Sequence, residues 1–344
     1  MGRFTQFAVV AADQAIADSG IDFENVDTNF FGSIIASGIG GMPTFEKQYD
    51  NFLKGGPRRV SPFFVPMLIS DISAGHVSIK YGLKGINYCT TSACASASHA
   101  IGEAFNSIRF GRAIGMVAGG SEASTCIMGV SGFNALKALS TRNDDPEHAS
   151  RPFDLNRDGF VLGEGGGMRV LEELEMAKLR GAKIYGEIVG AGFTGDAYHI
   201  TAPVPGGDGA MRAMNIARQD AGWQPEDVDY LNAHGTSTSY NDSIETEAIK
   251  KSFGEHAYNM PISSTKSMVG HLLGASGAVE AVAVLSCMTE GFIHPTINYE
   301  TPDPECDLNY VPNTSIKKQI NKALSNSFGF GGHNVSLAFK RYEE

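Results

Sequence analysis

One cysteine stands where a protein could make a sulfur nucleophile. Cys94 lies in the segment 89–97, in which a short apolar run gives way to small residues typical of a helix start. The first backbone N–H groups of a helix lack intrahelical partners and form the positive end of the helix dipole, so they favour a thiolate over a thiol. A lone cysteine is more often a buried structural residue, so other residues must support this prediction.

Two histidines supply that support. His234 follows a strand-like run, residues 229–233, and begins a loop rich in Gly, Ser and Thr. His271 ends a second loop of this composition, residues 264–270. Sites in α/β proteins are commonly built at the carboxyl ends of strands. Either imidazole alone would be interpreted as structural, but the two together with Cys94 predict an active site.

The composition narrows the class of protein. Of the 344 residues, 42% are hydrophobic and 19% are charged, as expected for a globular enzyme. The net charge of −11 argues against nucleic-acid binding, which needs a basic face. Five cysteines without a C-x-x-C pair argue against a zinc site and against a disulfide framework. We find neither a leader peptide nor a run of about 18 apolar residues, so we expect a cytoplasmic protein with no membrane span.

Strand-like and helical segments alternate along the chain. This alternation favours a layered α/β fold with largely parallel sheets. The strand-like runs are residues 30–36, 86–91, 114–118, 167–171, 184–190, 228–232, 261–264 and 334–340. The helical patterns are residues 4–19, 64–80, 95–109, 209–221, 243–253 and 276–290.

A faint internal repeat suggests a duplicated chain. The segments 94–111 and 274–291 both follow a strand and a short loop, open with small residues and end at a glycine. Helices with so little side-chain bulk in their first halves suit close packing at the centre of a molecule. We therefore expect two halves, residues 1–172 with the nucleophile and residues 173–344 with both histidines.

Four motifs together resemble one family. They are the Cys94 segment, residues 234–238, residues 264–271 and residues 326–332, in matching order and spacing. The chain resembles the elongating β-ketoacyl-acyl-carrier-protein synthases, type II, of the thiolase superfamily. The resemblance implies a thiolase-like duplicated α-β-α-β-α layered fold and a homodimer. Two histidines separate the chain from the initiating synthases, and retention of Cys94 separates it from the chain-length-factor relatives.

The resemblance implies a ping-pong Claisen condensation without a cofactor. Cys94 would accept an acyl chain from acyl carrier protein as a thioester, and malonyl-carrier protein would then lose carbon dioxide and attack that thioester. Neutral His234 and His271 would donate ring N–H groups to the malonyl thioester oxygen, on which negative charge develops. A second oxyanion hole would use the backbone N–H groups of Cys94 and Phe330.

Further residues take their expected roles from the same resemblance. Lys266 and Glu280 match a buried pair that orients the centre, for which an ordinary surface pair is the alternative. Phe330 would gate the acyl pocket from a glycine-flanked loop that also holds Phe328, for which plain core packing remains equally open. Ile39 matches a position that lines the acyl pocket.

Docking of acyl carrier protein requires local cations, because that partner is strongly acidic and this chain carries a net charge of −11. By resemblance, Arg58, Arg59 and Lys137 lie near the entrance. Arg142 and Arg151 are weaker candidates. Each of these residues could also be an ordinary surface charge.

The first residues resemble an internal family segment that normally follows roughly 70 residues, which carry the first strand of the N-terminal sheet. We expect that strand to be central, so its absence would leave a gap between the strands near 30–36 and 114–118. Either the true start lies upstream or the chain is a fragment.

Two functional alternatives also stay open: a polyketide or aryl-polyene-type ketosynthase, and a catalytically silent carrier-protein-binding remnant.

Overall fold

The computed structural model describes residues 1–343, which form two compact units, each with its own α/β core. Unit 1 comprises Met1–Ala135, Gly163–Lys183 and Leu272–Val279, and unit 2 comprises Leu136–Leu162, Ile184–His271 and the described residues from Glu280 onward. Each unit is therefore built from three segments that are separate in the sequence. The predicted α/β class is confirmed.

The sheet of unit 1 has four strands in the order β2 (Asn87–Tyr88), β1 (Phe31–Ala36), β3 (Gly115–Glu122) and β4 (Gly165–Glu172). The pairs β1–β2 and β1–β3 are parallel, and β4 is antiparallel to β3. Every residue of β1 and β3 is buried. Burial on both faces is typical of parallel strands covered by helices.

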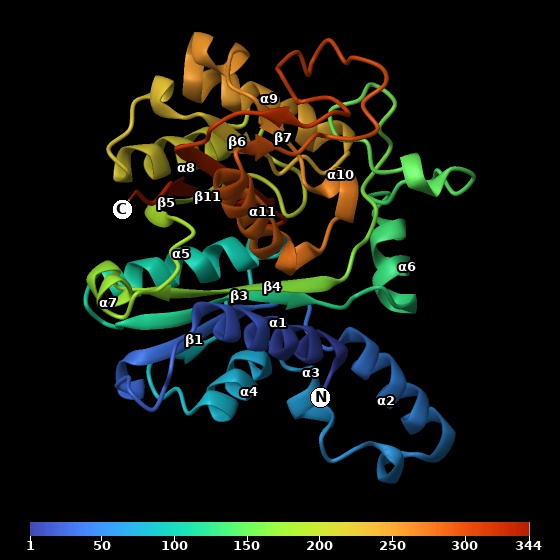
Figure 1. The fold of residues 1–344 in the computed structure, drawn as a ribbon. Helices are drawn as coiled ribbons and strands as arrows, with labels where there is room; N and C mark the ends of the chain where they lie inside the picture. Colours follow the sequence, from blue (N-terminus) through green and yellow to red (C-terminus); the bar gives the residue numbers. More distant parts are fainter. Residues whose placement is uncertain (344) are drawn as a thin grey trace. The chain divides into compact units, whose positions relative to one another are not determined.

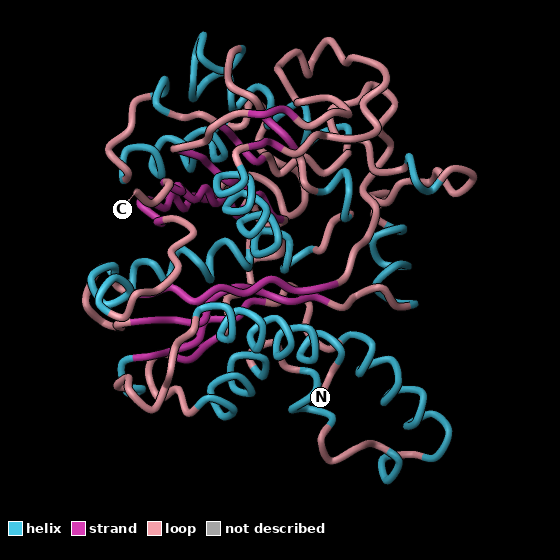
Figure 2. The backbone as a smooth tube through the Cα atoms, in the orientation of Figure 1, coloured by secondary structure: helices cyan, strands magenta, loops and turns pink. Residues whose placement is uncertain are grey.

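Helices cover both faces of this sheet. Figure 1 shows α1 (Arg3–Ser19) and α4 (Ile72–Tyr81) on one face and α5 (Ser96–Arg109) on the other. Figure 2 shows α1 lying along the strands. The small residues of α5 allow a close approach, because a methyl group at Gly120 of β3 would stand 2.9 Å from the Cβ of Ala97. The other helices of this unit are α2 (Met42–Gly55), α3 (Phe64–Leu68), α6 (Ile127–Ala135) and α7 (Leu174–Leu179).

The prediction of a gap in the N-terminal sheet is wrong. Strand β1 pairs directly with β3, from Phe31 opposite Gly115 to Ala36 opposite Gly120. The backbone groups of both strands are therefore satisfied by each other, and no central strand separates them.

The sheet of unit 2 has the order β7 (Ile262–Ser263), β6 (Tyr230–Asn232), β10 (Lys322–Gly329), β11 (His333–Lys340) and β5 (Glu187–Gly195). Two parallel pairs are followed by the antiparallel pair β10–β11, as in unit 1. Strand β5, antiparallel to β11, has no counterpart in the described sheet of unit 1. The repeated order supports the predicted duplication.

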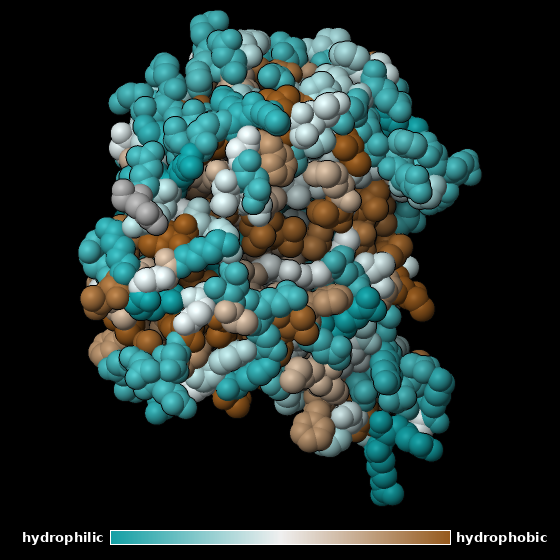
Figure 3. All heavy atoms as spheres, viewed as in Figure 1, coloured by the Kyte–Doolittle hydropathy of each residue, from teal (hydrophilic) through white to brown (hydrophobic). Residues whose placement is uncertain are grey.

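Helix α8 (Asp208–Asp220) packs tightly on β5, where glycines make room for it. A methyl group at Gly190 would stand 2.3 Å from the carbonyl oxygen of Ala217, and one at Gly192 would stand 2.0 Å from that of Ala213. Helix α9 (Ser239–Phe253) packs beside α8. Figure 3 shows hydrophilic side chains over this region, as expected for the outer faces of amphipathic helices. The remaining elements of this part of the chain are α10 (Lys266–Val269), α11 (Ser276–Glu290), β8 (Phe292–Ile293) and β9 (Ile316–Lys317).

The structure differs from the expected elements at several places. The helical pattern at 64–80 is divided into α3 and α4, and the run at 86–91 gives only the two residues of β2. Strand β10 was not predicted. By length and composition, Leu273–Glu290 is the one described helix that could cross a membrane, but 61% of it is buried inside the protein, and core helices pass the same test.

Candidate active site

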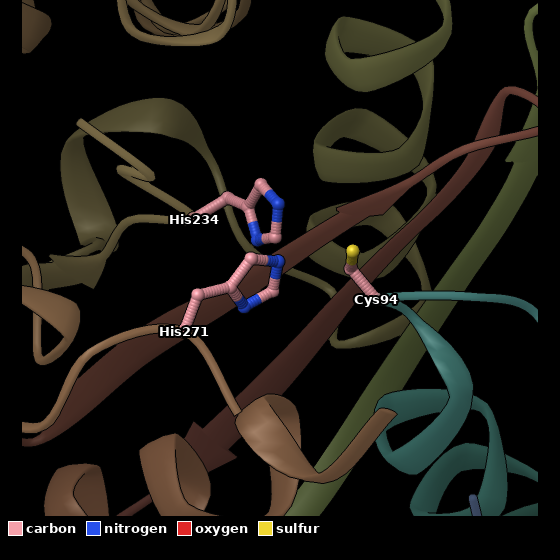
Figure 4. A group of neighbouring side chains, drawn as sticks. All are labelled: Cys94, His234 and His271. Carbon is pink, nitrogen blue, oxygen red and sulfur yellow. The ribbon is translucent and has the colours of Figure 1, made fainter. Parts of the chain in front are cut away.

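Cys94 lies at a sharp turn of the backbone directly before α5, as Figure 4 shows. The preceding residue, Ala93, has a φ of +50°, a left-handed conformation that alanine rarely adopts. The helix begins at Ser96, so the predicted placement of Cys94 at a helix start is confirmed to within two residues. The turn projects the Cys94 side chain at the end of the helix that carries positive partial charge.

Side chains of α5 hold this turn. The hydroxyl of Ser96 donates to the carbonyl oxygen of Ala93 at 2.6 Å and accepts from the backbone N–H of Ser92 at 2.8 Å. The hydroxyl of Ser92 lies 2.7 Å from Nδ1 of His99. A non-glycine residue in the left-handed region costs about 1–3 kcal/mol, and these hydrogen bonds offset that strain.

His234 lies directly after β6 with its backbone bound to a buried carboxylate. The backbone N–H groups of His234 and Gly235 donate to the two oxygens of Glu245, each at 2.8 Å. Burial raises the pKa of Glu245 to about 7. This residue was not predicted from the sequence; the available signal was an acidic residue on the helix that directly follows the His-Gly loop.

The ring of His234 is oriented by a buried ion pair. The ammonium of Lys266 pairs with the carboxylate of Glu280, and both side chains are almost fully buried. The same ammonium donates to Nδ1 of His234 at 3.2 Å and to its carbonyl oxygen at 2.7 Å. Because Nδ1 accepts, the ring proton of neutral His234 lies on Nε2, which is then a hydrogen-bond donor. The expected pair is present and buried.

His271 faces His234 within unit 2. Figure 4 shows the two rings turned toward each other; their centroids are 5.5 Å apart and their planes meet at 86°. The backbone N–H of His271 donates to the carbonyl oxygen of Val161 at 2.7 Å, and the edge of its ring meets Phe160 at 5.0 Å between centroids.

Both imidazoles are held neutral. Burial lowers the pKa of His234 well below its ordinary value, and the charge of Lys266 and the neighbouring His271 lower it further. Burial, and then Lys266, likewise lower the pKa of His271. An ammonium beside His234 also disfavours a bound metal cation there. The pair is therefore suited to donating hydrogen bonds.

The two aromatic residues occupy different places. Phe328 is half-buried in β10, not in a loop as predicted, and its ring centroid lies 5.7 Å from that of His234. Phe330 is half-buried in the turn between β10 and β11. It is followed by Gly331 and Gly332, with φ values of +85° and +73°. These glycines permit a turn that other residues would strain.

Ile39 and the candidate docking residues lie outside the α-helices and strands. Ile39 is half-buried in the loop that follows β1. Arg58 and Arg59 are exposed in the 3-10 helix Pro57–Arg59 of unit 1, and Lys137 is exposed in unit 2.

One weaker docking candidate is wrong. Arg151 is only 1% exposed, and its guanidinium forms ion pairs with Asp154 and Glu300. Its Nε and Nη2 groups donate to these two carboxylates, so Arg151 is a structural residue. Arg142 is half-buried.

Comparisons with known proteins agree with this chemistry. The family described as "Beta-ketoacyl synthase, N-terminal domain" matches residues 1–177, and "Beta-ketoacyl synthase, C-terminal domain" matches residues 185–300. The "3-oxoacyl-[acyl-carrier-protein] synthase 2" of Synechocystis sp. is 55% identical over 343 residues, covering 100% of this chain and 82% of the relative. That of Staphylococcus aureus strain N315 is 54% identical, covering 100% and 83%.

Solved structures are similar over the same length. A β-ketoacyl synthase from Burkholderia phymatum has a TM-score of 0.93 and 40% identity, covering 100% of this chain and 83% of its own. A type II polyketide ketosynthase, solved in complex with its acyl-carrier protein and bound to a hexaketide, has a TM-score of 0.97 and 38% identity, covering 99% and 85%.

Proposed function

Because the chain belongs to the β-ketoacyl synthase family, we propose that it condenses acyl-acyl carrier protein with malonyl-acyl carrier protein in fatty acid chain elongation. The products would be 3-oxoacyl-acyl carrier protein, carbon dioxide and the unloaded carrier. The enzyme is thus an acyltransferase of the 3-oxoacyl-carrier-protein synthase type. The high identity to curated synthases supports this reaction class.

In the first half-reaction, the thiolate of Cys94 attacks the carbonyl carbon of the acyl thioester. A sulfur–carbon bond to Cys94 forms and the sulfur–carbon bond to the carrier breaks. The carrier leaves as a thiolate, which takes up the proton that the Cys94 thiol lost on ionising. The covalent acyl-enzyme divides one difficult step into two easier ones. Backbone N–H groups of Cys94 and Phe330 are our candidates for stabilising the tetrahedral oxyanion.

In the second half-reaction, the carbon–carbon bond to the malonyl carboxylate breaks and carbon dioxide leaves. The electron pair remains as an enolate, with negative charge on the thioester oxygen. His234 and His271 donate N–H groups to that oxygen, and the enolate carbon then attacks the acyl-Cys94 carbonyl and releases the thiolate. The observation that carries this proposal is the Lys266 contact to Nδ1 of His234, because it leaves Nε2–H as a donor.

Intact-mass measurement after incubation with acyl-acyl carrier protein tests the assignment. We expect an acyl adduct on the 344-residue protein that disappears in Cys94→Ala. Adding malonyl-carrier protein should discharge the adduct and give a 3-oxoacyl carrier. A protein that folds cooperatively yet forms no adduct would be the silent carrier-binding remnant instead.

A polyketide or aryl-polyene-type ketosynthase is the second candidate. The structural likeness to a type II polyketide ketosynthase favours it, whereas the more identical curated relatives favour fatty acid synthesis. Repeated condensation without reduction of the 3-oxo group would identify the polyketide activity, because its product keeps several ketones. A single two-carbon extension would support elongation.

We propose that the enzyme works as a cytoplasmic homodimer. Exposed aromatic rings along α2 support self-association, since Phe45, Tyr49 and Phe52 form a stacked row and are 44%, 53% and 44% exposed. Sedimentation equilibrium of the purified chain measures this state. A monomer at micromolar concentration would contradict it.

A further inference from the structure

A buried carboxylate in unit 1 has no place in the mechanism above. Glu122 ends β3 and is fully buried. Its partners on the loop after β1 are all neutral donors. The backbone N–H of Gly38 donates to Oε2 at 2.7 Å, and the hydroxyl of Ser37 and the backbone N–H of Ile39 donate to Oε1 at 3.2 and 3.4 Å. The loop that carries Ile39 is thus fastened to one side chain.

The same carboxylate fastens two further segments. The hydroxyl of Ser124 donates to Oε1 at 3.1 Å, and the backbone N–H of Gly274 donates to Oε2 at 3.2 Å. A methyl group at Gly274 would stand 2.2 Å from the backbone nitrogen of Gly38 and 2.8 Å from Oε2 of Glu122. Glycine is needed here, because the two backbones meet on the carboxylate.

The Ile39 loop also meets the turn that presents the nucleophile. The hydroxyl of Thr91 donates to the carbonyl oxygen of Ser37 at 3.0 Å. A methyl group at Gly38 would lie 3.4 Å from the carbonyl oxygen of Ala93, the strained residue before Cys94. A displacement of the Ile39 loop would therefore also displace the turn that holds Cys94.

We propose that Glu122 is a positioning residue that sets which acyl chains the enzyme accepts, by fixing the Ile39 loop against the Cys94 turn. This inference rests on the proposed function and on the expectation, taken from the family resemblance, that Ile39 lines the acyl pocket. Hydrogen bonds to a buried carboxylate are stronger than those between neutral groups, and their loss would leave backbone N–H groups unpaired. The loop would then relax, and Ile39 would no longer mark a fixed boundary of the pocket.

The test compares acyl chains in one enzyme. In Glu122→Gln the side chain keeps its shape, but its NH₂ group must face backbone donors. We measure kcat/KM for acyl transfer to Cys94 with carriers loaded with chains from hexanoyl to hexadecanoyl. We expect the long-to-short ratio of kcat/KM to change by more than about threefold, since pocket contacts discriminate chain length by such factors. Ser37→Ala should give a smaller change in the same direction.

A matched control separates positioning from plain destabilisation. Asp154 is also a fully buried carboxylate, but it belongs to unit 2 and binds Arg151 and the backbone of residues 300 and 301. Asp154→Asn should lower the melting temperature without changing the chain-length ratio. An unchanged ratio in both Glu122→Gln and Ser37→Ala, with wild-type adduct formation intact, would overturn the inference. Absence of any wild-type adduct would instead overturn the proposed function.

Discussion

At the residue scale, the proposed chemistry depends on which ring nitrogen of His234 carries the proton. Lys266 lies between a carboxylate and an imidazole, and it donates to Nδ1 of His234. A buried lysine is costly unless it is paired, and Glu280 supplies the pairing. Stability and chemistry thus depend on the same ammonium, but through different partners.

Lys266→Met should separate these two contributions. Without the ammonium, Lys266 no longer fixes the ring proton of His234 on Nε2. Malonyl decarboxylation should therefore fall by about 100-fold, which is the effect of losing one oxyanion donor. Acyl transfer to Cys94 should fall much less. Glu280 would stay buried without a partner, and the free energy of unfolding should fall by about 3–5 kcal/mol.

The double variant Lys266→Met/Glu280→Leu is the control. Removing both charges should restore most of the stability but not the decarboxylation rate, as measured by denaturant unfolding and carbon dioxide release. Recovery of both together would mean that Lys266 acts only through stability.

The pKa of Glu245, raised to about 7, predicts a pH-dependent stability. The pKa in the folded chain exceeds the ordinary glutamate value of 4.5, so between these two pH values the folded state holds a proton that the unfolded state has lost. The free energy of unfolding should therefore fall as pH rises from about 4.5 to about 7, with this residue contributing up to about 3 kcal/mol. The free energy of unfolding of wild type and of Glu245→Gln is measured by urea unfolding at each pH. The difference between the two values gives the contribution of this residue. A difference independent of pH would contradict the burial argument.

At the scale of elements, close packing of α8 on β5 depends on residues without side chains. Gly192→Ala would place a methyl group 2.0 Å from the carbonyl oxygen of Ala213. We expect it to destabilise unit 2 by about 1–3 kcal/mol, the cost of overpacking. Gly195→Ala on the same strand is the matched control, because its nearest neighbour would be 4.0 Å away. Equal melting temperatures for both variants would show that α8 can shift to make room.

The candidate catalytic residues were easier to propose from the sequence than the residues that hold them in place. Cys94, His234 and His271 sit in short motifs whose composition is legible along the chain. Glu245 and Glu122 act on backbone N–H groups, in the case of Glu122 on segments 84 and 152 residues away. Partners as distant as those of Glu122 leave no local pattern.

Strand β10 was not predicted from the sequence for a related reason. Its buried residues include Ser325, Asn326 and Ser327, so it lacks the hydrophobic run expected of a central strand. Tertiary pairing with β6 and β11 decides its conformation. Sheet order is equally non-local, which is why the expected gap in unit 1 was wrong.

At the scale of the whole molecule, recognition of the carrier must act against the overall charge. The chain carries −11, and an acidic partner would be repelled at long range unless cations gather at its docking surface. Arg58 and Arg59 are adjacent and exposed, so they offer such a local site in unit 1.

Charge reversal tests whether this site is used. Arg58→Glu/Arg59→Glu should raise KM for acyl-acyl carrier protein about tenfold, because each reversed charge replaces attraction by repulsion at the interface. The effect should weaken as salt is added, since exposed charges are screened. Lys84→Glu, another exposed reversal in unit 1, is the control and should leave KM nearly unchanged. If Lys84→Glu raises KM as much as Arg58→Glu/Arg59→Glu does, net charge alone governs association and the arginines form no docking site.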